Sequence, residues 1–214
     1  LDLSGIEGSV REQRTSVAMA ERVELIYGGR ISAGNLLGDP DLLRWEDGGY
    51  VAGDIKSGTG MDETGGVYKP KKSYAMQLAL YTDILERKGV SRSRSGFIWD
   101  VKGEEVLYEF DLVFGKRNPT TLWDQYQVAL ATVTSLVERS SDNLPAYSST
   151  CKQCHWFSTC LSEMESADDL TLIPRLGRKQ RDTMSPTITG VQEMANSNPG
   201  DYIVGNKKTA FTGV

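Results

Sequence analysis

Apolar residues recur at helical spacing in two long segments of the chain. In SYAMQLALYTDILERKG, residues 73–89, the recurring positions are Tyr74, Leu78, Tyr81 and Leu85. From about residue 120 to residue 139 they are Trp123, Tyr126, Leu130, Val133 and Val137. Residues three or four apart share one face of a helix, so both segments are predicted to be amphipathic helices. Gly89 follows two basic residues and is a suitable end for the first of them.

Short apolar runs between turn residues predict a set of strands. Residues 16–31 predict a short helix that runs into a strand ending near Gly28-Gly29, after a loop or frayed helix in residues 1–15. The other predicted strands are residues 36–45, 50–58, 95–101 and 104–114. The EDGG sequence at 46–49 is a hairpin signal, so the strands on either side of it are predicted to be antiparallel.

The segment between the predicted strand 50–58 and the first long helix has a different character. Residues 59–72 are rich in Gly, Asp, Lys and Thr and show no apolar period, so a mobile loop is predicted there. Taken together, the strands and helices predict an α/β fold, with a mixed central sheet flanked by helices and a small helical segment at the C-terminal end.

Composition narrows the class of protein. The chain has 214 residues, enough for one domain of moderate size and a small appendage, and its 39% hydrophobic and 25% charged residues are typical of a globular protein. A net charge of −5 argues against coating nucleic acid by charge alone, but it permits a nuclease whose acidic cleft is neutralised by metal. No run approaches the about 18 apolar residues of a membrane span, and no signal pattern is present. We therefore expect a soluble cytoplasmic protein; because it begins at Leu1, we also expect upstream residues.

The sequence GDIKSG, residues 53–58, places a carboxylate and an ammonium group two positions apart. Side chains alternate along a strand, so Asp54 and Lys56 should share one face while Ile55 packs into the opposite core. Because such a tripeptide is common, the motif alone favours an exposed edge strand with a solvated ion pair. Additional polar residues favour a site: Asp41 lies on the preceding strand, and a Gln-x-x-x-Tyr pair lies on the following helix.

That helical pair is Gln77 and Tyr81, whose spacing puts both polar ends on one helix face. Carboxylates such as Asp41 and Asp54 are ligands for a hard divalent ion, Mg²⁺ or Mn²⁺. Such an ion acidifies water and offsets phosphate charge, while Lys56 would orient or help to deprotonate the nucleophile. The combination predicts a phosphodiesterase site.

These motifs, in the order GDPDLLRW, YVAGDIKSG, QLALYTDIL and CKQCHWFSTC, resemble the RecB-like branch of the PD-(D/E)xK nuclease superfamily, including its CRISPR-associated, iron–sulfur-containing members. The resemblance covers residues 15 to 165 or so and implies a restriction-endonuclease-like fold. It implies that Asp41 and Asp54 bind metal and that Lys56 is the catalytic lysine. Gln77 and Tyr81 match the helix pair of this branch.

The first metal-binding acid has a rival in Asp39, but the Gly38-x-x-Asp41 spacing favours Asp41. The resemblance also implies an upstream helix with a His or Glu that completes the metal site. Glu21 and Glu24 are the candidates in this chain.

Three cysteines, Cys151, Cys154 and Cys160, follow a C-x2-C-x5-C pattern. An odd, clustered set is a poor disulfide framework and suits an iron–sulfur cluster or Zn²⁺, with three buried free cysteines as the alternative. The resemblance implies a 4Fe–4S cluster whose fourth ligand is an upstream cysteine. This chain has no fourth cysteine, so either upstream residues supply it or His155 completes the site; the upstream segment is favoured, because His155 directly follows Cys154.

The chain is predicted to divide into a nuclease domain, residues 1–165, and a helix-hairpin-helix-like segment, residues 166–214. From Leu170 onward the six basic residues are Arg175, Arg178, Lys179, Arg181, Lys207 and Lys208, against three acidic ones, a net charge of +3. Backbone amides near Gly177, together with Arg178 and Lys179, could hold a DNA phosphate without reading sequence. A small helical cap with a solvated basic face is the alternative.

The function predicted from these features is metal-dependent cleavage of DNA by an exonuclease that acts on single strands or duplex ends in repair or recombination. The resemblance implies, as partners, a helicase or a further C-terminal nuclease domain, so the end at Val214 is expected to be internal to a longer protein. The alternative function is that of a non-catalytic nucleic-acid-binding scaffold.

Overall fold

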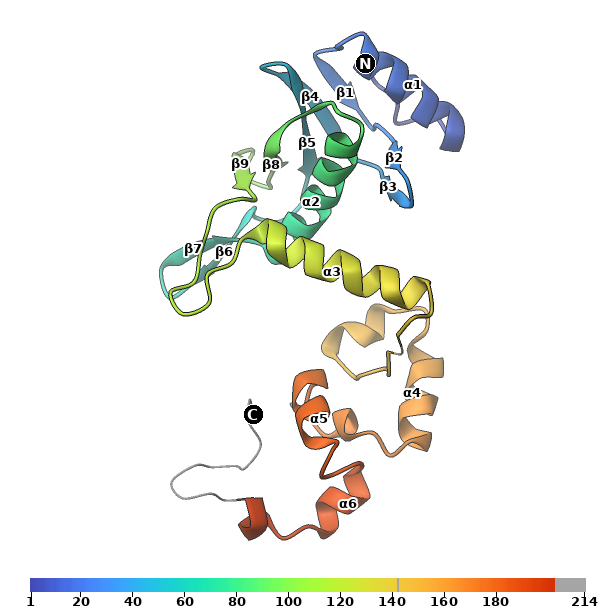
Figure 1. Cartoon of the computed structure of the whole chain (residues 1–214), viewed down its shortest axis with the longest axis vertical. Coiled ribbons are helices and arrows are strands. Elements are labelled where there is room, and N and C mark those ends of the chain that lie inside the picture. Colours follow the sequence, from blue (N-terminus) through green and yellow to red (C-terminus); the bar gives the residue numbers. More distant parts are fainter. Residues whose placement is uncertain (142, 203–214) are drawn as a thin grey trace. The chain divides into compact units, whose positions relative to one another are not determined.

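The computed structural model describes residues 1–141 and 143–202, and its chain forms two compact units, Leu1–Glu138 and Arg139–Val214 (Figure 1). Two lysines counted in the basic tail, Lys207 and Lys208, lie outside the described residues. Among the described residues, no helix combines the length and the apolar character that crossing a membrane requires.

The first unit is built on a five-stranded mixed sheet. Its elements are α1 (Gly8–Ala20), β1 (Leu25–Tyr27), β2 (Ile31–Ala33), β3 (Leu36–Gly38), β4 (Leu42–Glu46), β5 (Gly49–Ile55), β6 (Met61–Thr64), β7 (Val67–Pro70), α2 (Lys72–Arg87), β8 (Ser91–Trp99), β9 (Glu105–Glu109) and α3 (Leu122–Val137). The strand order is β1-β4-β5-β8-β9, with β5 and β8 parallel and the other neighbours antiparallel. Because parallel strands need a crossover, α2 connects β5 to β8 and packs against both.

The main core lies between the sheet and α2. Tyr50 and Ala52 of β5 are fully buried there against Leu78 and Ile84 of α2 and their neighbours. The alternate residues of β5 face the other side, where Val51 belongs to a small cluster with Leu42 and Phe97. On that side the Arg44 guanidinium lies 4.2 Å from the centre of the Phe97 ring.

Ile55 does not pack into the opposite core, and this prediction was wrong. Its side chain is 47% exposed. It ends β5 and is paired with Trp99 at the end of β8, which is exposed to the same degree. Alternation along the strand does place Ile55 on the opposite face from Asp54, but that face is only thinly covered at the strand end.

Three other predictions about local structure are corrected. Residues 59–72 are not a loop, since β6 and β7 form a hairpin whose turn, Gly65-Gly66, has positive φ at both glycines. Residues 36–45 are two strands, because β3 pairs with β2 whereas β4 pairs with β1 and β5. Pro40, which cannot donate a backbone hydrogen bond, lies at the break. The predicted strand 104–114 is shorter, because β9 ends at Glu109. For residues 1–15, predicted as a loop or a frayed helix, the helix applies from Gly8 onward, where α1 begins.

The second unit consists of short helices. They are η1 (Ser149–Gln153), α4 (Phe157–Ser166), η2 (Leu170–Leu172), α5 (Arg178–Met184), α6 (Val191–Asn196) and η3 (Pro199–Tyr202). Leu170, Met184 and Ile188 form its small core. The buried Arg181 supports it with an ion pair to Asp169 at 3.0 Å and a hydrogen bond to the Pro145 carbonyl. The cysteine segment lies in this unit.

Candidate active site

Two aspartates meet where β4 begins and β5 ends. Asp41 directly precedes β4, and Asp54 is the penultimate residue of β5. The Asp41 amide donates to Asp54 Oδ1 at 3.2 Å, and the Ile55 amide donates to Asp41 Oδ2 at 2.9 Å. The antiparallel pairing of Leu42 with Gly53 brings them together. The predicted neighbouring carboxylates are therefore adjacent in the structure.

Lys56 lies on the same side as Asp54 and connects it to α2. Its Nζ is 2.7 Å from Asp54 Oδ2 and donates to Gln77 Oε1 at 2.9 Å. Gln77 Nε2 in turn donates to the Tyr81 hydroxyl at 2.7 Å. The Tyr81 hydroxyl donates to the Asp39 carbonyl at 3.3 Å. This chain of contacts joins the strand end, the helix and the turn before β4, so all five predicted residues lie in one place.

Burial raises the pKa values of two side chains in this site, Asp54 and Tyr81. The Asp54 carboxyl is 1% exposed, and burial raises its pKa above the usual value, although Lys56 and the Asp41 amide act in the opposite direction. Burial, together with the nearby Asp54, raises the pKa of Tyr81 to about 12. Tyr81 is therefore a neutral hydrogen-bond donor at pH 7.

The two aspartates offer oxygen atoms of the kind that a hard divalent cation binds. Asp54 Oδ2 is buried, and although the Lys56 ammonium is close to it, no described residue gives it a hydrogen bond of suitable geometry. Such an oxygen fits a ligand for Mg²⁺ or Mn²⁺. Within the described residues, no group of three or more His, Cys, Asp or Glu side chains is arranged to hold a metal ion. The protein side of this candidate site is therefore a pair of carboxylates.

Asp39, the rival for the first acid, has different partners. Its carboxylate receives hydrogen bonds from Arg11 at 2.8 Å and from Arg30 at 3.1 Å. Two guanidinium groups thus neutralise it, which supports Asp41 as the acid available to a cation. Glu21 follows the last residue of α1, Glu24 lies just before β1, and both side chains are exposed. No contact with Asp41 or Asp54 is found for either within the described part of the chain.

Two residues next to the site were missed by sequence reasoning. The Tyr74 ring centre lies 5.5 Å from Lys56 Nζ and 5.3 Å from Lys71 Nζ. Tyr74 was assigned to the apolar face of its helix, and Lys71 to a mobile loop. The spacing Tyr74-x-x-Gln77 was the available signal, because residues three apart share a helix face.

Comparison with known families identifies the class of protein. Residues 5–161 match the family model of the PD-(D/E)XK nuclease superfamily, and the chain belongs to this superfamily. The predicted α/β fold, with its mixed sheet flanked by helices, is confirmed. Nucleases of this superfamily typically use divalent metals such as Mg²⁺ or Mn²⁺. A search of curated proteins found no match.

The three cysteines of the C-x2-C-x5-C pattern are free thiols in the second unit. Cys151 accepts a hydrogen bond from the Ser148 amide at 3.3 Å, and Cys154 is exposed. Cys160 lies on α4. Among the described residues, the three thiols do not lie together in a group that could hold a metal ion.

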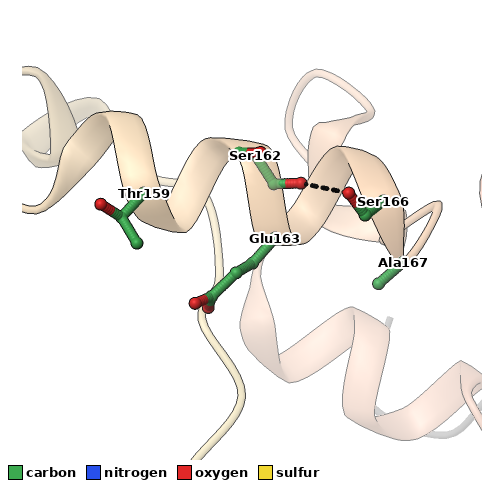
Figure 2. Close-up of a pocket in the computed structure, with 5 residues that line it drawn as sticks. All are labelled: Thr159, Ser162, Glu163, Ser166 and Ala167. Carbon is green, nitrogen blue, oxygen red and sulfur yellow. Dashed lines mark hydrogen bonds between the residues drawn. The ribbon is translucent and has the colours of Figure 1, made fainter.

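A hollow lies on one face of α4 in the second unit (Figure 2). It is lined by Thr159, Ser162, Glu163, Ser166 and Ala167, all from one helix and its end. The Ser166 hydroxyl donates to the Ser162 carbonyl at 2.8 Å within the helix. Its lining has one carboxylate and otherwise small side chains, and these do not form a set of catalytic groups.

The predicted phosphate-binding residues lie at the start of α5. Gly177 precedes the helix, and its amide donates to the Gln180 side chain at 3.2 Å. Arg178 donates to the Asn143 side chain at 2.6 Å, and Lys179 is exposed. The Gly177 amide is therefore already engaged, whereas Lys179 faces solvent.

Proposed function

We propose that the first unit is a metal-dependent deoxyribonuclease whose active site consists of Asp41, Asp54, Lys56, Gln77 and Tyr81. One observation carries the proposal: a fully buried carboxylate, Asp54, is in contact with an ammonium group that α2 holds in place through Gln77. A buried ion pair is an expensive way to stabilise a fold. Its position at a strand end, in a chain of this superfamily, supports a catalytic use.

The residues have separate parts in this mechanism. Mg²⁺ or Mn²⁺, held by Asp41 and Asp54, would supply the activation of water and the neutralisation of phosphate charge. Lys56 places a positive charge beside the scissile phosphate, where it stabilises negative charge that develops in the transition state. Gln77 fixes the direction of the Lys56 ammonium. Tyr81, neutral at pH 7, holds Gln77 from the other side.

Digestion of end-labelled single-stranded and duplex DNA, with Mg²⁺ or Mn²⁺, tests this proposal. Wild type should cut, and Lys56→Ala and Asp54→Asn should each reduce the rate by about 100-fold or more while Lys88→Gln, at the far end of α2, leaves it unchanged. Cleavage that is indifferent to Lys56 would place the active site elsewhere. DNA binding without cleavage by the wild type, in every metal, would instead favour the non-catalytic scaffold.

The finer assignment is an exonuclease acting on DNA ends in repair or recombination, with a helicase or a further C-terminal nuclease domain as partner. It is supported by the resemblance of the ordered motifs to RecB-like nucleases. Comparing a linear duplex with a closed circular DNA of the same sequence tests it. An exonuclease degrades only the linear form, so nicking of the circle would contradict this assignment. Equal cleavage of an RNA oligonucleotide would contradict the preference for DNA.

The cysteine segment is proposed as a 4Fe–4S site on its C-x2-C-x5-C spacing alone, with Zn²⁺ as the alternative. Anaerobically purified protein should then contain iron and acid-labile sulfide and absorb near 400 nm, and Cys154→Ser should lose all three. Zinc without iron would favour the alternative, and neither metal would end the proposal.

The start of α5 is proposed as a helix-hairpin-helix-like phosphate contact through Gly177, Arg178 and Lys179. Exposure of Lys179 supports this contact. Lys179→Gln should weaken binding of duplex DNA by a few-fold at low salt and reduce its salt dependence, whereas Lys152→Gln, an exposed lysine on η1, should not. Unchanged binding for Lys179→Gln would leave a helical cap as the better assignment.

A further inference from the structure

The Tyr74 ring brings two ammonium groups together beside the candidate active site. Lys56 and Lys71 both lie within about 6 Å of its centre, the range in which an aromatic ring attracts a cation. Tyr74 lies on α2, one turn before Gln77. A Cβ added at Gly58 would lie 3.1 Å from the Tyr74 hydroxyl and 3.6 Å from Lys71 Nζ, so the glycine leaves this place open.

Lys71 is held there by its backbone. Its amide donates to the Gly60 carbonyl at 3.4 Å, and the buried Tyr108 hydroxyl donates to the same carbonyl. The Gly60 amide donates to Asp100 at 3.2 Å. These contacts fix the base of the β6–β7 hairpin against β8 and β9. The backbone of Lys71 is therefore anchored where its side chain and that of Lys56 contact the same Tyr74 ring.

The cations of this hairpin lack acidic partners. Among the described residues, no ion pair to a carboxylate is found for Lys69, Lys71 or Lys72. Asp62 is paired with Lys69 across the hairpin, but no ion pair joins them. Lys56 is ion-paired with Asp54, but Lys71 is not neutralised by a described carboxylate, and its free charge near the candidate site would suit a polyanion that also contacts a bound cation.

Lys69 and Lys72, the neighbours of Lys71 along the chain, line a groove. Its volume is about 780 Å³, and residues of the β6–β7 hairpin, the segment after β9 and the start of α3 line it. Its lining includes Met61, Pro70, Leu112, Phe114, Lys69 and Lys72. Leu112 is 60% exposed and Phe114 is 45% exposed. Glu109 is the acidic residue of the lining, against the two lysines. The groove is thus apolar, with basic residues at one side.

We propose that Lys71 and this groove bind an unpaired strand of nucleic acid that continues from the active site. Lys71 binds a phosphate next to the one beside Lys56, and the groove receives an unstacked base against Phe114. A duplex hides its base faces, so an apolar groove flanked by cations is matched by a single strand or a frayed end. Tyr74 is a positioning residue that keeps the two cations adjacent. The statement that the strand continues from the active site rests on the proposed nuclease function.

Equilibrium binding of the full chain to fluorescein-labelled oligodeoxythymidylate, in EDTA so that no cleavage occurs, tests the inference. A duplex of equal length is the comparison. Wild type should bind the single strand more tightly. Lys71→Gln should weaken this binding about tenfold and reduce the slope of log K against log salt by about 0.7. Phe114→Ala should weaken single-strand binding about tenfold and leave duplex binding unchanged.

The role of Tyr74 is separated from folding by a conservative pair. Tyr74→Phe keeps the ring and should bind as wild type, whereas Tyr74→Leu should lose several-fold in affinity at an unchanged Tm. Lys88→Gln, an exposed lysine on the same helix, is the matched control and should change nothing.

The inference is overturned if Lys71→Gln and Phe114→Ala both bind the single strand as wild type does, or if wild type prefers the duplex. Its failure is distinct from failure of the nuclease assignment. If only the nuclease assignment fails, Lys71→Gln and Phe114→Ala still weaken single-strand binding, but cleavage is absent or independent of Lys56.

Discussion

Tyr81 lies directly against the backbone of Gly38. A Cβ added at residue 38 would lie 2.6 Å from the Tyr81 ring, closer than any real contact of this kind. Glycine at the end of β3 therefore allows α2 to approach the sheet closely enough for Tyr81 and Gln77 to reach the strand that carries Asp54 and Lys56. The geometry of the candidate active site therefore depends on the lack of a side chain at residue 38.

Gly38→Ala should therefore impair both stability and catalysis. Because the Tyr81 ring must move, we expect a loss of about 1–3 kcal/mol in the free energy of unfolding and a fall in cleavage rate of about tenfold or more. Urea denaturation and initial cleavage rates measure the two effects. Gly5→Ala, where nothing lies within 4 Å of the added Cβ, is the control. Full activity in Gly38→Ala would show that the position of Tyr81 does not matter.

Gln77→Ala removes the acceptor of the Lys56 ammonium. We expect kcat to fall by about 10- to 100-fold, because Lys56 remains charged but is no longer directed. The stability change should stay near 1 kcal/mol, since the side chain is only partly buried. Gln127→Ala on α3, an exposed glutamine, should leave both quantities unchanged. A rise in KM with unchanged kcat would assign Gln77 to substrate binding instead.

Tyr126→Phe tests the contact between α3 and α2. The Tyr126 hydroxyl donates to the buried Asp83 carboxylate at 2.7 Å. Its removal leaves one acceptor of Asp83 without this donor, so a loss of about 1–3 kcal/mol is expected in the free energy of unfolding. Tyr68→Phe, where the side chain is 65% exposed, is the matched control. Equal stabilities of the two variants would mean that water replaces the hydroxyl at Asp83.

Acid should weaken the unit through Glu105. The hydrogen bonds from Arg44 hold the pKa of Glu105 below its usual value of 4.5. A group with a lowered pKa in the folded state stabilises the protein above its unfolded pKa, and this contribution is lost as pH falls through the folded value. Between about pH 6 and about pH 3 the free energy of unfolding should thus fall more in wild type than in Glu105→Gln. The effect should be modest because the pair is partly exposed.

Chemical denaturation at both pH values measures this difference. Glu104→Gln, at the exposed neighbouring position, should follow wild type. An identical acid response in Glu105→Gln would mean that other carboxylates control the acid transition.

The sequence was sufficient to predict the elements with strong local signals. The apolar repeat of residues 73–89 predicted α2, and the EDGG turn predicted the β4–β5 hairpin, so the adjacency of Asp41, Asp54 and Lys56 followed from pairing alone. The β6–β7 hairpin was missed because its strands carry no apolar alternation, although Gly65-Gly66 was a turn signal.

Long-range contacts could not be predicted in the same way. The neutralisation of Asp39 by Arg11 and Arg30 depends on how α1 packs, and the proximity of Lys71 to Tyr74 depends on the hairpin that was missed. The exposure of Ile55 depends on how little material covers the far face of the sheet, which strand periodicity does not encode.

The β6–β7 hairpin is inserted in the crossover that connects β5 to β8, between Lys56 and the first turn of α2. Its base is anchored at Gly60 and Lys71, outside the two strands, and the pairing of the central sheet does not involve them. Residues 61–70 therefore form an exchangeable module, in which length and sequence can vary while the register of β5 with β8 is kept. If the hairpin contacts nucleic acid as proposed, substrate preference can thus change with residues 61–70 while Asp41, Asp54 and Lys56 keep their positions.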